Sequence, residues 1–379
     1  MKILILGGCG YIGRAVVRYL VGNQDVSQLV IADIQPIKGE DIVAEVSSKK
    51  VSYYDVDINK QDLLIQAMKG FNVVLNASSH EYNLRIMNAA LESRVSYIDL
   101  GGFYHITKEQ LALDDEFAEK RLTAVIGMGA SPGITNVFSI LGSSYLDHVN
   151  EIYVRTGCIG GTGFPYSPKS VLEQVTISPI VYKNREFQVV EPLSGWERYD
   201  LLEPILEIEG FLAISSELAT LPLTIEGAGS ITHRIAFSDA LTRNIIALRE
   251  MGLLSKFPLQ IKGMEMSPLE FVRQYFVSQN QSCSLDAYMS LRVDVIGEKN
   301  GSNRSVVLQA VEGPRSDCRL SGPSLLAGLS AAVTCHMVGV GRIEMKGVIP
   351  PERALEPEIL LDALEREGVR FTIQEHPLS

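Results

Sequence analysis

Short runs rich in apolar residues alternate with amphipathic segments along the first third of the chain. The apolar runs predict buried parallel strands at residues 3–6, 29–32, 51–56, 73–76, 95–100 and 124–126. Helical spacing of apolar residues predicts helices at residues 12–21, 60–69, 81–92 and 108–121. Strands that alternate with helices in this way are typical of an α/β fold with a doubly wound parallel sheet.

The pattern changes after Gly133. Residues 134–146 predict a helix, and longer strand-like segments follow at residues 151–158, 186–190, 231–237 and 288–296. Helices at 324–338 and 357–367 and a short strand at 370–374 end the chain. Because 379 residues exceed what one core holds, about 250–300, we expect two domains. Residues 1–132 and 323–379 would form the first domain, and residues 133–322 a second, inserted α+β domain for substrate binding and dimerisation.

Composition excludes several classes of protein. The net charge of −11 makes nucleic acid an unfavourable partner. Five scattered cysteines without a C-x-x-C pair, and a first strand that begins at Lys2, favour a reduced, cytoplasmic location without a leader segment. The histidines show no ligand spacing, so we expect no metal. The apolar stretch 320–340 contains Pro323 and many small residues, which favours a buried helix over a membrane span.

A glycine-rich turn lies between the first strand and the first helix. Gly8, Gly10 and Gly13 satisfy G-x-G-x-x-G, and Tyr11 and Ile12 open the helix whose free N–H groups would bind a pyrophosphate. Asp33 ends the second strand and would accept hydrogen bonds from the adenosine ribose. A carboxylate there repels a 2′-phosphate, so the sequence predicts NAD, with NADP as the alternative that nearby Lys38 keeps open.

Other residues fit the same dinucleotide groove. Asn76, Ala77 and Ser78 close the fourth strand, where ligands gather at the carboxyl ends of a parallel sheet. Asp57 follows the third strand and would meet the adenine amino group. Its alternative role is a helix cap together with Asn59.

The glycines also allow a second reading. Gly7, Gly10 and Gly13 satisfy G-x-x-G-x-x-G, the spacing of short-chain dehydrogenases and nucleotide-sugar epimerases. Those enzymes use a Tyr-x-x-x-Lys pair, and Tyr104 and Lys108 match it. Those enzymes carry a serine at the end of the fifth strand, some dozen residues before this tyrosine, and here that strand ends in Tyr-Ile-Asp-Leu, so this class stays the alternative.

Four blocks resemble the saccharopine dehydrogenase and lysine dehydrogenase-like family: residues 100–107 (LGGFYHIT), 127–136 (GMGASPGITN), 216–222 (SELATLP) and 347–352 (GVIPPE). The resemblance covers nearly the whole chain. It implies a Rossmann domain, a second inserted domain, a homodimer and oxidoreduction at the C–N bond of an amino acid. In the saccharopine reductase branch an aspartate precedes Pro-Gly, whereas this chain has Ser131, which makes saccharopine itself a doubtful substrate.

The chemistry needs an acid–base group and contacts for cofactor and substrate. His105 is the first candidate, because its ordinary pKa of about 6.5 suits neutral pH. Glu217 is the second, and Asp99 would orient the nicotinamide ribose. Gly101, Ser131 and Pro132 would join the cofactor site, and Gly133, Asn136, Arg155 and Thr220 would bind substrate. The structural alternatives are a backbone contact for His105, a partner such as Arg234 for Glu217, a turn contact for Asn136 and a surface position for Arg155.

The leading functional hypothesis is an NAD-dependent dehydrogenase acting on lysine or a related amine-bearing acid. Reductive C–N bond formation, as in saccharopine or carboxynorspermidine synthesis, is the second hypothesis. A dinucleotide sensor without turnover is the third, and the serine at position 131 favours it.

Overall fold

The computed structural model describes residues 1–161, 163–278 and 283–378. Within these residues, one sheet is entirely parallel, with the order β17-β6-β5-β4-β1-β2-β3. Its strands are β1 Lys2–Leu6, β2 Gln28–Asp33, β3 Val51–Asp55, β4 Val73–Asn76, β5 Ser96–Asp99, β6 Thr123–Val125 and β17 Gly347–Ile349. This is the doubly wound sheet that the alternation of strands and helices predicts, and the chain order reverses between β1 and β4.

Helices cover both faces of this sheet. Their bounds are α1 Tyr11–Val21, α2 Pro36–Val46, α3 Gln61–Met68, α4 Asn83–Ser93, α5 Phe103–Leu111, α6 Asp114–Glu119 and the 3-10 turn η1 His80–Tyr82. On one face α1 packs with α12 Gly322–Gly339, and on the other α3 and α4 pack together. Central strands are therefore buried on both sides, which explains why they are apolar at every position.

Two helices differ from the sequence-based expectation. The sequence predicts one helix over residues 108–121, but the structure has α5, which begins at Phe103, and the separate α6. The sequence predicts nothing at α2, because that helix is largely exposed and buries only Gly39 and Ile42. An exposed helix lacks the apolar periodicity on which the prediction depends.

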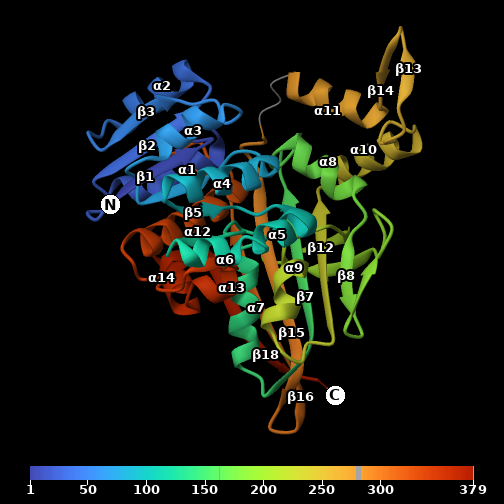
Figure 1. Ribbon diagram of the computed structural model, residues 1–379. Helices are drawn as coiled ribbons and strands as arrows, with labels where there is room; N and C mark the ends of the chain where they lie inside the picture. The colour runs from blue at the N-terminus through green and yellow to red at the C-terminus, as the bar shows by residue number, and fades with distance from the viewer. Residues whose placement is uncertain (162, 279–282, 379) are drawn as a thin grey trace.

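The second sheet is mixed and larger (Figure 1). Its main path is β10-β11-β12-β7-β15-β16-β18, and β8 and β9 attach beside β12. Only the β7–β12 pairing is parallel among its described strands. The bounds are β7 His148–Ile159, β8 Ile180–Lys183, β9 Glu186–Val189, β10 Glu197–Asp200, β11 Glu207–Leu212, β12 Ser230–Phe237, β15 Tyr288–Lys299, β16 Ser302–Glu312 and β18 Arg370–Pro377.

The remaining elements surround this second sheet. They are α7 Ile134–Ser144, α8 Pro168–Thr176, α9 Glu217–Thr224, α10 Asp239–Glu250, α11 Pro268–Ser278, α13 Pro351–Ala354, α14 Pro357–Arg366 and the hairpin β13 Leu259–Ile261 with β14 Met264–Met266. Figure 1 shows that hairpin projecting away from the body beside α10 and α11.

The C-terminal segment contributes a strand to each of the two large sheets. The segment after residue 323 does complete the first sheet through β17, but β18 pairs with β16 in the second sheet, so the expectation that all of 323–379 belongs to the first domain is wrong. The helix expected in the apolar stretch is α12, which is buried along most of its length. No helix among the described residues is long and apolar enough to cross a membrane.

Candidate functional site

A large cavity lies where the carboxyl ends of the first sheet face the second sheet. It encloses about 600 Å³. The turns after β1, β2, β4 and β5 line one wall, and β7, β12, β15 and α8 contribute the other. A doubly wound sheet binds ligands at the point where its strand order reverses, and this cavity lies beside that point.

The glycine turn forms the floor of the first wall. Gly7 adopts a φ of 71°, and a Cβ there would lie 2.6 Å from the Ser78 backbone nitrogen. Gly10 caps α1, and Tyr11 and Ile12 line the cavity behind it. This leaves backbone N–H groups at the start of a helix facing the cavity, which is an arrangement that binds phosphates.

Gly8 and Gly13 act differently from Gly10. Neither lines the cavity. A Cβ on Gly8 would lie 2.7 Å from a methyl carbon of Ile31, and one on Gly13 would lie 2.6 Å from the Gly8 Cα. These two glycines therefore allow α1 to pack tightly against the strand, and the position that requires a left-handed backbone is Gly7.

Two carboxylates stand at the adenosine end of the groove. Asp33 lines the cavity, and its carboxylate accepts hydrogen bonds from the Cys9 backbone nitrogen at 3.1 Å and from the Gln35 side chain. Asp57 also lines the cavity while it accepts a bond from the Asn59 backbone nitrogen at 2.9 Å. Asp57 therefore lies in the groove and closes a turn with Asn59, but the cap of α3 is Lys60, and the contact of Asp57 with adenine stays a prediction.

The turn after β4 is held by its own side chains. Asn76 is 1% exposed, and its carbonyl oxygen accepts bonds from the backbone nitrogen and the hydroxyl of Ser78. Its amide donates to Asn83, which in turn donates to the Gly101 carbonyl. Asn76, Ala77, Ser78 and Gly101 all line the cavity, so this network fixes two adjacent turns at its edge.

Asp99 is a scaffold residue and does not line the cavity. It is fully buried, and it accepts hydrogen bonds from the backbone nitrogens of Gly101 and Gly127 and from Tyr97 and Gln110. Burial raises the pKa of its carboxyl group, and these bonds partly offset the effect. The catalytic role expected for Asp99 is therefore corrected: it holds the turns that form the wall.

A buried polar cluster marks the chemical end of the cavity. The Ser131 hydroxyl donates to the Glu217 carboxylate at 2.6 Å and lies 3.3 Å from His233 Nε2. Thr135 donates to the same Glu217 oxygen at 2.9 Å. The other Glu217 oxygen is buried and accepts no hydrogen bond among the described residues. Ser131, Pro132 and His233 line the cavity, and Glu217 supports them from behind.

His233 is placed to exchange a proton. Burial lowers the pKa of its ring, and the nearby charge of Glu217 only partly opposes this. The Nδ1 atom lies 3.4 Å from the Ala213 carbonyl oxygen, which suits a neutral ring that carries its hydrogen there. Because the single Ser131 hydrogen is given to Glu217, the lone pair of Nε2 stays free for a ligand in the cavity.

Several expected site residues lie elsewhere. His105 is exposed on α5 and does not line the cavity, so its catalytic assignment is corrected. Arg155 is paired with Glu197 and Asp294 on the opposite face of the sheet, whereas its neighbour Thr156 faces the cavity. Strand alternation explains this difference of one residue.

The remaining substrate candidates are also structural. Asn136 is fully buried, accepts from the Gly133 backbone nitrogen and donates to Thr220 and Glu352. Gly133, Asn136 and Thr220 do not line the cavity. They lie behind the Ser131 turn, so the structure does not bring them to the cavity, and their contacts with substrate stay predictions. Tyr104 and Lys108, the pair of the epimerase alternative, do not line the cavity either.

The second wall contains residues that the sequence did not indicate. They include Thr156, Tyr166, Ser170, Gln174, His233 and Met289, and His80 is a further such residue in the first wall. His233 lies on a strand that the sequence predicts, but no local motif distinguishes it from the other histidines. Only the pairing of β12 with β7, which pairs in turn with β15, brings it opposite the glycine turn.

Comparison with known protein families identifies the family to which this chain belongs. Residues 3–125 match the saccharopine dehydrogenase NADP binding domain, and residues 129–369 match the saccharopine dehydrogenase C-terminal domain. The chain belongs to the saccharopine dehydrogenase family. It is thus an oxidoreductase of that family with an NAD(P)-binding domain, and the short-chain dehydrogenase reading of the glycines is superseded.

Curated members of the family are distant in sequence. A carboxyaminopropylagmatine dehydrogenase from Synechocystis is 23% identical over 72% of this chain and 71% of its own. A carboxynorspermidine synthase from Vibrio cholerae is 25% identical over 99% of this chain and 97% of its own.

Two solved structures of the same fold extend the comparison. Saccharopine dehydrogenase (L-Glu forming) from Saccharomyces cerevisiae, 14% identical, covers both chains fully with a TM-score of 0.78. Homospermidine synthase from Legionella pneumophila in complex with NAD, 13% identical, covers all of this chain and 91% of its own with a TM-score of 0.68. Both confirm the expected fold.

Proposed function

We propose that this chain is an NAD-dependent oxidoreductase that forms or cleaves the C–N bond of a secondary amine. The observation that carries the proposal is a single cavity with two distinct walls. The glycine turn and Asp33 form one wall, and the buried Ser131–Glu217–His233 cluster forms the other. Hydride transfer and proton transfer can therefore take place in one enclosed space.

The charge of the cavity favours an amine as substrate. None of its described lining residues is a lysine or an arginine, and the Glu217 carboxylate lies directly behind Ser131 at the chemical end of the cavity. Arg155, the cation expected to hold a substrate carboxylate, is already paired on the other face of the sheet. Two relatives are named for carboxyaminopropylagmatine and carboxynorspermidine, which are carboxylated polyamines, and this supports a polyamine-like substrate over lysine.

The reaction can be written in balance. In the oxidative direction R₂CH–NH₂⁺–R′, NAD⁺ and H₂O give R₂C=O, R′NH₃⁺, NADH and H⁺. A nicotinamide held at the glycine turn would supply the hydride acceptor for this reaction. His233 Nε2 takes the nitrogen proton, and in the reverse direction it returns that proton. Ser131 and Glu217 hold the ring beside the reacting atoms and stabilise its protonated form by charge.

Asp33 supports NAD as the cofactor. Its carboxylate stands at the end of β2 and already binds the Cys9 backbone, so it is fixed where a 2′-phosphate would lie. Lys38, the cation that favours NADP, does not line the cavity. We therefore expect NADH to bind more tightly than NADPH.

A spectrophotometric assay tests the proposal. NADH or NADPH is mixed with an aldehyde or keto acid and a diamine, polyamine or lysine, and absorbance at the nicotinamide band is followed. We expect NADH consumption only when carbonyl compound and amine are both present, with a product whose mass is their sum less water plus two hydrogens. NAD-dependent release of ammonia from lysine would instead favour oxidative deamination. Tight NADH binding without turnover across the panel would favour a dinucleotide sensor.

A further inference from the structure

A second histidine lines the cavity next to a carboxylate, and both residues are distant in sequence from His233. His80 belongs to η1, directly after the turn that follows β4, and it lines the cavity beside Phe103. Its Nε2 lies 3.1 Å from Glu173 Oε2, a carboxylate oxygen of α8. Both side chains are largely buried, at 14% and 17% exposed. The contact joins the nucleotide-binding wall to the second domain.

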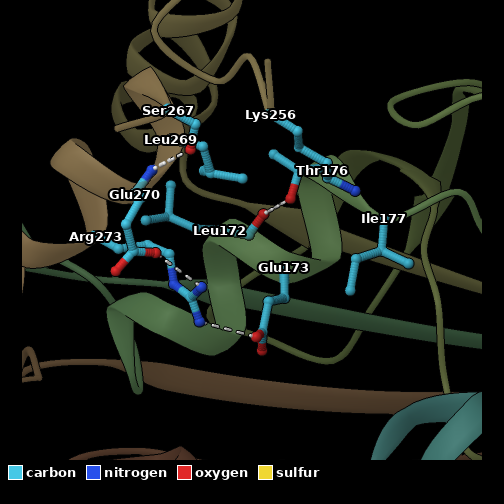
Figure 2. A pocket seen from close by; sticks show the side chains of 9 residues that line it. All are labelled: Leu172, Glu173, Thr176, Ile177, Lys256, Ser267, Leu269, Glu270 and Arg273. Carbon is cyan, nitrogen blue, oxygen red and sulfur yellow. Dashed lines mark hydrogen bonds and ion pairs between the residues drawn. The ribbon is translucent and has the colours of Figure 1, made fainter. Parts of the chain in front are cut away.

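Glu173 also belongs to a second, smaller pocket on the far side of α8. That pocket encloses about 270 Å³ between α8 and α11. Figure 2 shows the Arg273 guanidinium directed toward the carboxylates of Glu173 and Glu270, and the Arg273–Glu173 contact measures 3.2 Å. Arg273 thus occupies Oε1 of Glu173. Oε2 accepts no hydrogen bond among the described residues and faces His80.

The reaction proposed above creates a need for such a contact. Each oxidative turnover releases one proton inside a cavity that then also holds two ligands. A proton has to leave for each product formed, and it has to return for each C–N bond made in reverse. Histidine and carboxylate pairs move protons at neutral pH with little change in geometry.

We propose that His80 and Glu173 form the path by which this proton passes between the reaction cavity and the second pocket. His80 takes the proton from the cavity at its other ring nitrogen and releases the proton on Nε2 to Glu173 Oε2. Water in the second pocket then removes it from the carboxylate. No electron moves in this step, and each transfer breaks one bond to hydrogen and makes one. The path rests on the proposed amine oxidoreduction.

Charged side chains of both signs surround the His80–Glu173 pair. Arg273 of α11 pairs with Glu173, and Lys169 of α8 pairs with Glu81. Glu270 also pairs with Arg273. Arg273 places a guanidinium nitrogen 3.2 Å from Oε1 of Glu173. Lys256 is the other cation that lines the second pocket.

A second ion pair between η1 and α8 provides a matched control. Lys169 of α8 pairs with Glu81 of η1, so Glu81→Gln removes an ion pair between the same two elements and keeps both side chains of the His80–Glu173 contact. If the His80–Glu173 contact only docks α8 on η1, Glu81→Gln and Glu173→Gln have similar effects. If the contact carries protons, only Glu173→Gln and His80→Gln slow turnover.

The test compares kcat of the full chain and the three variants under saturating NADH, carbonyl compound and amine. We expect His80→Gln and Glu173→Gln to lower kcat about 100-fold and to raise its solvent deuterium isotope effect, with KM for NADH unchanged. Added imidazole should restore part of the His80→Gln rate. Glu81→Gln should stay within about twofold of the parent. Wild-type turnover in His80→Gln, or an equal loss in Glu81→Gln, overturns the path.

A second measurement does not need turnover. The ¹⁵N resonances of the His80 ring, in protein saturated with NADH, should shift in Glu173→Gln and stay in place in Glu81→Gln. An unmoved ring resonance in Glu173→Gln overturns the path whatever the rates are. Absence of amine-linked turnover in the parent chain contradicts the proposed function instead, so the two failures are distinct.

Discussion

The two walls of the cavity present different kinds of groups to a ligand. The nucleotide-binding wall presents backbone groups of the Gly7–Gly10 turn and side chains that bond to their own loop, such as Asn76 with Ser78. The opposite wall presents side chains from strands paired over long sequence distances, and His233 is brought to Ser131 across 102 residues. Changes in the first wall should therefore alter cofactor binding, and changes in the second should alter the chemical step.

The largest effect is expected for His233→Asn. The ring is the only described histidine that contacts the Ser131–Glu217 pair, so its loss should lower kcat about 100- to 10,000-fold. NADH affinity, measured by fluorescence titration, should change little, because the first wall is intact. His105→Asn is the matched control, since His105 is exposed outside the cavity. Equal loss in both variants would contradict the assignment.

The pH profile of the parent chain tests the same residue. Burial lowers the pKa of His233, so its base form persists at pH values where an exposed histidine is already protonated. The acidic limb of kcat/KM for amine oxidation should therefore lie below about pH 6.5. A limb above that value, or one that survives in His233→Asn, would assign it to another group.

The first wall has its sharpest test at Gly7. Alanine there would adopt a φ of 71° and place its Cβ 2.6 Å from the Ser78 nitrogen, which strains the turn that holds the cofactor. We expect NADH affinity to fall about tenfold, equivalent to about 1.4 kcal/mol, with a smaller effect on kcat. Gly22→Ala is the control, since Gly22 ends the same helix with nothing near its missing Cβ and an ordinary φ of −77°.

The same difference between the walls explains what the sequence could predict. The glycine turn, Asp33 and residues 76–78 are each fixed by a strand and the turn that follows it, so local patterns place them at the cavity. Ser131 and Pro132 are placed there by their family block. His105 and Arg155 failed because a helix face and a strand register decide where they point, and neither is encoded within a few residues. His80 and His233 were missed because their partners, Glu173 and Ser131, lie about a hundred positions away.

The smallest predicted effect concerns the joint behind the second wall. Glu352 is buried, and it accepts bonds from Asn136 at 2.9 Å and from Thr224 at 2.7 Å. Burial raises its pKa above the usual 4.5, so the folded state binds a proton that the unfolded state releases. Stability should therefore decline as pH rises from about 4.5 through the raised pKa, and remain reduced above it.

Glu352→Gln removes that titration while keeping the shape of the side chain. Relative to the parent, the variant should be more stable near pH 7.5 than near pH 5, by about 1 kcal/mol or less, as measured by urea unfolding at both values. Loss of stability that is the same at the two values would mean that Glu352 acts through its hydrogen bonds alone. The variant should also keep NADH affinity and most of kcat, because Glu352 reaches the cavity only through Asn136 and the Ser131 turn. A large loss of kcat with normal NADH binding would show that Glu352 and Asn136 set the position of Ser131 relative to His233. Residues behind the cavity wall would then also affect the chemical step.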